Sequence, residues 1–161
     1  MSHEVQAFIL RGPAERAALA GLQHWTMVRL EADFHLIPLT DELFDEIAAA
    51  YPGLEDEPYE ALWKFSGSTR VFTEALSKEG PVLYFETEYF GREGGQSAAV
   101  WIDGKLALEP VNEDEGPINR GLELMGLVPK EPQDAFETLG LGDCSDNDEW
   151  LARAAEGRST N

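Results

Sequence analysis

The dipeptide Asp103-Gly104 constrains the fold of this chain more than any other short segment. Asp-Gly supplies the positive φ values of a two-residue type I′ turn, and apolar residues lie on both sides of it. The turn fixes the register of the two strands that it joins. In that register Trp101 lies opposite Leu106. Ala99 then lies opposite Leu108, so one face of the hairpin is apolar.

A further strand is expected before this hairpin. Residues 82–90 are rich in aromatic and β-branched side chains, and the segment GREGG follows them at 91–95. GREGG lacks the Gly-Lys-Ser or Gly-Lys-Thr ending of a phosphate-binding loop, and a strand rather than a helix comes after it. We interpret it as a hairpin loop, which predicts a three-stranded antiparallel meander over residues 82–109.

Two more strands are expected nearer the N-terminus. Residues 4–10 form a short, mainly apolar run, and within 26–37 apolar residues alternate with polar ones. This period of two predicts a half-buried strand over 26–37, because successive side chains of a strand point to opposite faces. Its polar row consists of Arg29, Glu31, Asp33 and His35.

Helices are expected where apolar residues recur at helical spacing beside capping residues, Pro or Gly. Their approximate ranges are 13–22, 40–51, 68–79, 117–126, 135–139 and 145–155. Because strands and helices come in blocks rather than in regular alternation, we predict an α+β fold: an antiparallel sheet packed with several short helices. A chain of 161 residues fits one globular domain, expected over 1–156, with a frayed tail at 157–161.

The charge balance restricts the kinds of partner. Asp and Glu number 31 and Lys and Arg 12, which gives a formal net charge of −19 at pH 7. Such a chain repels nucleic acids and anionic membranes and attracts basic proteins. No apolar run reaches the roughly 20 residues of a membrane-spanning helix, and the N-terminus does not resemble a signal peptide. We therefore expect a soluble, cytoplasmic protein.

Cysteine and metal chemistry are not expected. Cys144 is the only cysteine, so neither an intrachain disulfide nor a multi-cysteine zinc site can form. Its neighbours Asp143 and Asp146 oppose formation of a thiolate. The acidic tract 143–149 lacks the glycine and the final glutamate of a calcium-binding EF-hand loop, and we interpret it as the start of a helix. We expect no metal and no cofactor.

Glu86 and Glu88 are the first candidates for catalysis. They are two residues apart in the expected strand 82–90, so both point to the same side, with carboxylates about 6 to 7 Å apart. This spacing lies between those of retaining and inverting glycoside hydrolases. If strand 26–37 pairs in the same sheet, Asp33 and His35 could join them in an acid–base or divalent-cation site. A solvated, ion-paired sheet face is the interpretation that we favour.

An acidic segment supplies candidates for partner binding. No Lys or Arg occurs between Arg29 and Lys64, whereas acids accumulate there. Acids of this density, with aromatic residues nearby, can attract a basic protein by electrostatic steering. The candidate residues are Asp41, Glu42, Asp45, Glu46, Glu55, Asp56 and Glu57.

One part of the chain resembles known proteins. The run YFETEYFG at 84–91, with Gly94, Gln96, AAVW at 98–101 and GPIN at 116–119, is similar to a pattern in small uncharacterised bacterial proteins. Some of those resemble immunity proteins that neutralise toxins delivered between cells. The resemblance covers about residues 80–126 and implies an acidic, partner-binding domain without known catalytic residues. The pattern has a second glycine where this chain has Arg92, so the loop differs.

Three functions remain open from the sequence. We favour an acidic binding protein that inhibits a basic protein, as immunity proteins do, or escorts it. The first alternative is a hydrolase or metal-dependent enzyme that uses the carboxylates of the sheet face. The second is a homo-oligomeric structural protein joined through a sheet edge or exposed aromatic residues.

Overall fold

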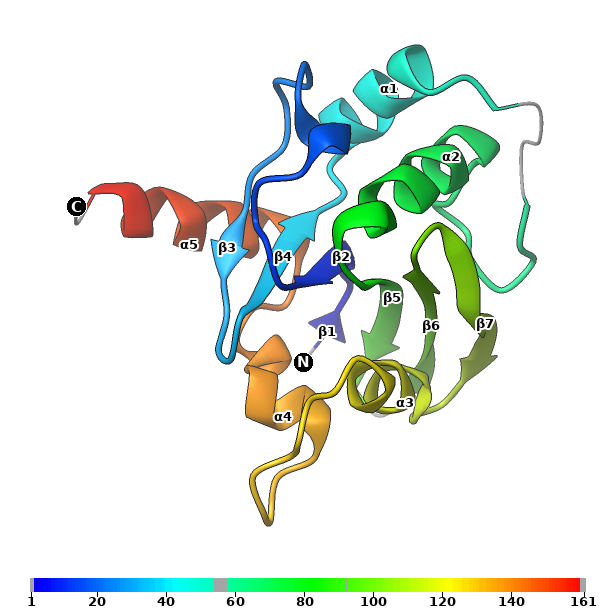
Figure 1. The fold of residues 1–161 in the computed structure, drawn as a ribbon. Coiled ribbons are helices and arrows are strands. Elements are labelled where there is room, and N and C mark those ends of the chain that lie inside the picture. Colours follow the sequence, from blue (N-terminus) through cyan, green and yellow to red (C-terminus); the bar gives the residue numbers. More distant parts are fainter. Residues whose placement is uncertain (1, 54–57, 92, 160–161) are drawn as a thin grey trace.

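A computed structural model of the chain describes residues 2–53, 58–91 and 93–159. Its centre is a seven-stranded antiparallel sheet with the strand order β3-β4-β2-β5-β6-β7, in which β1 also pairs with β5 (Figure 1). The strands are β1 (Ser2–His3), β2 (Gln6–Arg11), β3 (Val28–Arg29), β4 (Phe34–Pro38), β5 (Val82–Phe90), β6 (Glu93–Ile102) and β7 (Lys105–Glu113). The predicted α+β class and antiparallel sheet are confirmed.

Helices cover both faces of the sheet. They are α1 (Asp41–Ala50), α2 (Gly67–Leu76), α3 (Pro117–Leu124), α4 (Ala135–Leu139) and α5 (Asn147–Ser159). Helices α1 and α2 lie on one face, and α3 and α4 lie on the other (Figure 1). Helix α5 packs beside β3 and β4. The expected helix over 13–22 is only a single 3-10 turn at Ala17–Leu19.

Capping residues explain where several helices begin. Thr40 accepts a hydrogen bond from the amide of Leu43 at the start of α1. Helix α2 is capped by Ser66, whose side chain accepts from the amide of Thr69. At the start of α5, Asp146 accepts from the amide of Glu149. Each of these helices therefore begins beside a side chain that satisfies a free backbone amide.

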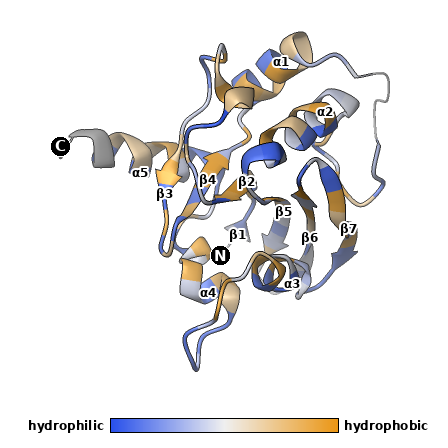
Figure 2. Ribbon diagram, in the orientation of Figure 1, coloured by the Kyte–Doolittle hydropathy of each residue, from blue (hydrophilic) through white to orange (hydrophobic). Residues whose placement is uncertain are grey.

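Two apolar cores lie on opposite sides of the sheet. Leu83 and Phe85 of β5 face the core beneath α3 and α4, whereas Val82 and Tyr84 face the core beneath α1 and α2. The alternation follows from the period of two in a strand. Figure 2 shows strongly apolar residues in β3 and β4 and in parts of the helices. Because helices and loops cover both faces, the expected solvated face of strand 82–90 is largely enclosed.

The expected single strand over 26–37 is instead a hairpin of β3 and β4. Val28 pairs with Leu36 and Arg29 with His35. The chain reverses at Ala32 and Asp33, whose φ angles are 54° and 66°. Both values lie in the left-handed region, which Asp tolerates better than most residues. The alternating pattern was real, but it continued through a turn that contains no glycine.

The Asp-Gly hairpin is confirmed in its first pairs and changes further on. Ile102 pairs with Lys105 and Trp101 with Leu106, as expected. An irregularity in the ladder then places Leu108 opposite Val100 rather than Ala99. β7 also continues to Glu113, beyond the expected end at 109.

Most of the expected glycine loop belongs to strand β6, which begins at Glu93. Gly94 has a φ of 141°, and a Cβ atom there would lie 1.9 Å from the carbonyl oxygen of Glu88. Only glycine fits this close approach of two strands. The glycine is thus required by the backbone of the hairpin.

Candidate functional site

The two candidate glutamates of β5 lie in different environments. Glu86 is 3% exposed, whereas Glu88 is exposed. The carboxylate of Glu86 accepts hydrogen bonds from the backbone amides of Trp63 and Lys64, each at 2.8 Å. It also accepts one from the Tyr84 hydroxyl at 2.7 Å. Glu86 therefore fastens the segment before α2 onto the sheet.

The protonation of Glu86 reflects this burial. Desolvation raises the pKa of Glu86, and the donors at Tyr84, Lys64 and Trp63 oppose the rise only in part. Burial and the neighbouring Glu86 carboxylate raise the pKa of Tyr84 well above its ordinary value. Tyr84 itself is fully buried. The pair is enclosed, so its hydrogen bonds hold the loop rather than face a substrate.

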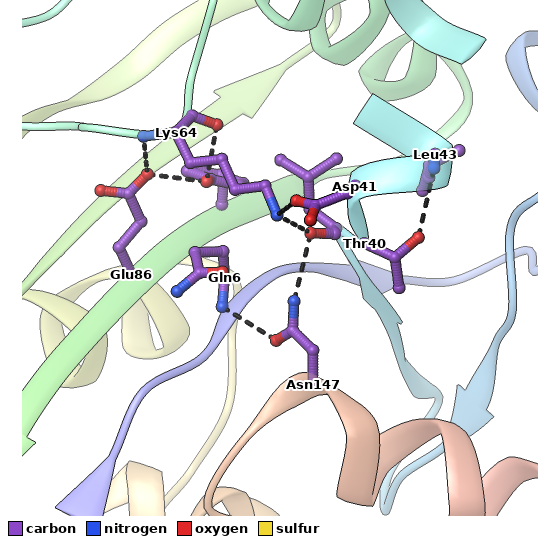
Figure 3. A network of polar contacts seen from close by, with 9 residues as sticks. Gln6, Thr40, Asp41, Leu43, Lys64, Glu86 and Asn147 are labelled. Atoms are coloured by element: carbon purple, nitrogen blue, oxygen red, sulfur yellow. Dashed lines mark hydrogen bonds and ion pairs between the residues drawn. The ribbon is translucent and has the colours of Figure 1, made fainter. Parts of the chain in front are cut away.

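A second group of polar contacts continues from this point (Figure 3). The ammonium group of Lys64 donates to the carbonyl of Leu39 and to the carboxylate of Asp41, both at 2.9 Å. The side chain of Asn147 donates to the same Leu39 carbonyl at 3.1 Å and accepts from the amide of Gln6 at 3.1 Å. These bonds join the starts of α1 and α5 to strand β2.

His35 and Asp33 do not meet the glutamates. His35 pairs with Leu10, which pairs with Val82. Val82 precedes Glu86 by four residues, or about 13 Å along the strand. Asp33 lies exposed in the β3–β4 turn. The expected cluster is therefore not formed, and the described residues contain no group of three or more His, Cys, Asp or Glu that could hold a metal ion.

His35 lies in basic surroundings instead. Burial lowers the pKa of His35, the positive charges of Arg29 and Arg16 lower it further, and Asp33 opposes them. The imidazole is therefore held in its neutral form by its neighbours. This environment differs from the carboxylate-rich one that the sequence interpretation required.

The acidic helix α1 uses part of its charge internally. Lys64 pairs with Asp41, and its hydrogen bond lowers the pKa of that carboxyl. Glu46 accepts hydrogen bonds from the amides of Gln23 and His24 at 2.8 Å each. Glu42 and Asp45 are exposed. The other candidates, Glu55, Asp56 and Glu57, lie outside the described residues.

A pocket that the sequence did not indicate opens at the tip of the β5–β6 hairpin, beside β1, α4 and the start of α3. Its volume is about 1110 Å³. We call it the acidic groove, because its described lining residues include four acids and neither Lys nor Arg. The groove is lined by Ser2, His3, Tyr89, Gly91, Glu93, Gly94, Gln96, Asp114, Glu115, Gly116, Asn119, Asp134, Phe136, Gly142 and Ser145.

Hydrogen bonds between separate segments position one wall of the acidic groove. Gln96 accepts from the amide of Ile118 at 2.8 Å and donates to the Tyr89 hydroxyl at 3.1 Å. That hydroxyl in turn donates to the carbonyl of Asp114. This series of bonds connects the first turn of α3 to β5 and β6, and it places Asp114 and the adjacent Glu115 at the rim.

Two negative charges act on Tyr89 in the same wall. Burial raises the pKa of the Tyr89 hydroxyl, and the hydrogen bond from Gln96 opposes this rise. The negative charges of Glu115 and Asp114 raise that pKa further. Both carboxylates therefore lie close enough to the Tyr89 side chain to affect its ionisation.

The opposite wall combines aromatic rings with a capping aspartate. His3 contacts the Thr87 hydroxyl through Nδ1 at 2.6 Å and the Leu141 carbonyl through Nε2 at 3.1 Å. Because a carbonyl only accepts, Nε2 carries the proton in this arrangement. The His3 ring meets the Phe136 ring edge to face, with centroids 5.8 Å apart. Asp134 caps α4 by accepting from the amide of Glu137 at 2.8 Å.

Sequence reasoning missed this site because its walls come from four separate segments. The dense acids at 113–115 are the one signal in the sequence that points to it. No helix within the described ranges has the length and apolarity needed to cross a bilayer. Comparisons with protein-family models, curated proteins and solved structures give no significant match for this chain.

Proposed function

We propose that this chain is an acidic binding protein that captures a basic protein partner, and that the acidic groove is where the partner docks. The observation that carries the proposal is the lining of the groove, in which Glu93, Asp114, Glu115 and Asp134 come together without a basic residue among the described lining. A concave site lined by one sign of charge concentrates ligands of the opposite sign. The net charge of −19 extends this attraction beyond the groove.

The state of the rim carboxylates supports binding rather than internal stabilisation. Within the described ranges, Glu93, Asp114 and Glu115 accept no side-chain hydrogen bond and form no ion pair. Asp41 and Glu46, by contrast, are engaged by their own chain. Like charges gathered without counter-charges repel one another, and a basic partner relieves that repulsion.

Two forms of capture fit this proposal: inhibition of a basic toxin, as in immunity proteins, and escort of a basic protein through the bacterial cytoplasm. Both require electrostatic complementarity at the groove. The hydrolase alternative has less support, because Glu86 is enclosed and His35 pairs with Leu10, which lies opposite Val82, four residues from Glu86.

A pair of charge-matched double variants tests the proposal. Asp114→Asn with Glu115→Gln removes two of the four negative charges that line the groove, and Glu42→Gln with Asp45→Asn removes two exposed negative charges from α1. Binding of the basic peptide acetyl-(Lys-Arg)₃-amide is measured by calorimetry at low and physiological salt. We expect about a tenfold loss of affinity for the groove variant and less than about a twofold loss for the α1 variant.

Equal losses in the two variants would mean that the peptide responds to net charge alone, and the proposed docking site would be wrong. Binding by the native chain should also weaken as salt is added, because rim charges are screened over about 8 Å at physiological ionic strength. Circular dichroism and thermal melting of each variant establish that the fold is intact.

A further inference from the structure

We propose that the acidic groove selects arginine over lysine, so that an arginine side chain is the anchor through which the basic partner docks. This inference rests on the proposed function and names the chemical group that the groove recognises. It follows from three properties of the groove: unpaired acceptors on separate elements, aromatic rings in the walls, and its size.

The carboxylates that line the groove come from different elements of the fold and are not gathered at one position. Glu93 belongs to β6, whereas Asp114 and Glu115 lie in the connection from β7 to α3. A guanidinium group presents five N–H donors in one plane and can reach carboxylates on different sides. An ammonium group is a compact charge with three donors, and it matches such a spread arrangement less well.

The aromatic residues favour the same group. Tyr89 and Phe136 line the groove on walls that come from different parts of the chain, and both are half-buried. The Tyr89 ring is held in place by bonds of its hydroxyl to Gln96 and to the Asp114 carbonyl. A guanidinium plane stacks on fixed rings of this kind, and its weaker hydration reduces the cost of entering the groove.

The groove is large enough to hold the partner's arginine side chain together with the peptide backbone that carries it. About 1110 Å³ exceeds what one side chain fills, so a short peptide segment around the arginine can also lie in the groove. Within the described part of the chain, Arg120 pairs with Glu113 at 2.8 Å and forms no ion pair with a rim carboxylate.

The test compares peptides of equal charge. We expect acetyl-(Gly-Arg)₃-amide to bind about fivefold more tightly than acetyl-(Gly-Lys)₃-amide, from the additional stacking and forked hydrogen bonds. The neutral isostere acetyl-(Gly-citrulline)₃-amide should not bind measurably. Phe136→Leu keeps the groove apolar at that position but removes the aromatic face, and it should reduce the preference for arginine to less than about twofold.

The outcomes separate this inference from the proposed function. If both peptides bind the native chain equally and the groove double variant weakens both, the docking site stands and arginine selectivity is wrong. If the groove double variant binds both peptides as tightly as the native chain does, the docking site itself is wrong and this inference fails with it.

If Phe136→Leu does not fold, the inference can be tested on the native protein instead. Amide shifts caused by the arginine peptide are mapped by NMR on the native protein. They should concentrate at Gly94, Gly116 and Gly142, which line the groove. Shifts concentrated on α1 instead would overturn the inference.

Discussion

Replacing Glu86 tests whether its carboxylate holds the segment before α2. In Glu86→Ala, the amides of Trp63 and Lys64 and the hydroxyl of Tyr84 lose an acceptor that lies 2.7 to 2.8 Å away. A hydrogen bond to a charged group contributes about 1.5 to 3 kcal/mol, so three such bonds give about 4.5 to 9 kcal/mol before offsets. The variant also removes the desolvation cost that raises the pKa of Glu86.

The net expectation is a decrease of about 3 to 5 kcal/mol in the free energy of unfolding, which is typical for breaking a buried charged contact. Urea unfolding at neutral pH measures it, followed by the fluorescence of the buried Trp101 and Trp150. Glu88→Ala is the matched control, because it removes the same charge from the same side of β5 at an exposed position. Its effect should stay within about 0.5 kcal/mol.

A decrease below about 1 kcal/mol for Glu86→Ala would refute the reasoning, because water or a shifted loop would then satisfy the three donors at little cost. Equal decreases in the two variants would also refute it, since the effect would then come from the strand and not from the enclosed carboxylate. Tyr84→Phe removes one donor and leaves the acceptor, and it should cost about 1 kcal/mol.

Three further predictions concern pH, backbone and salt. A raised pKa in the folded state means that the folded chain binds more protons, so Glu86 contributes stability at low pH that is lost as the pH rises from 4.5 through its folded pKa. The difference in unfolding free energy between the native chain and Glu86→Gln should therefore shrink as the pH is raised above 4.5 in urea titrations. Gly94→Ala should cost more than about 2 kcal/mol because of its clash with the Glu88 carbonyl, whereas Gly91→Ala, with open space and a φ of 67°, should cost about 1 kcal/mol, both measured by thermal melting. Added salt should raise the melting temperature of the native chain more than that of the Asp114→Asn, Glu115→Gln variant, because salt screens a repulsion that the variant lacks; an equal rise would count against repulsion at the rim.

The sequence predicted what short segments encode by themselves. Asp103-Gly104 determined a hairpin, and the second pair beyond it, Trp101 with Leu106, was correct because the turn fixes the pairs next to it. The turn at Ala32 and Asp33 was missed, since neither residue signals a left-handed backbone as glycine does. The residues at 103–104 were therefore sufficient to predict their turn, whereas those at 32–33 gave no recognisable turn signal.

The site depended on contacts between distant segments. The alternation of side chains along a strand correctly placed Glu86 and Glu88 on one side of β5. It contains no information about the segment at 63–64, which covers Glu86 but not Glu88. The acidic groove needs Gln96 beneath Ile118 and Tyr89 beside Asp114. Such contacts follow from tertiary packing, which a single sequence does not reveal by its periodicity.

The order of the strands also determines when the molecule can fold. Strand β2 precedes both β4 and β5 in the chain, yet it lies between them, and its residue Gln6 pairs with Glu86. The same Gln6 is bonded to Asn147 at the start of α5. Loop-closure entropy has to be overcome before these contacts stabilise the chain, so we expect slow folding that follows the synthesis of α5. A nascent chain that ends before Asn147 should remain open to proteases until α5 has left the ribosome.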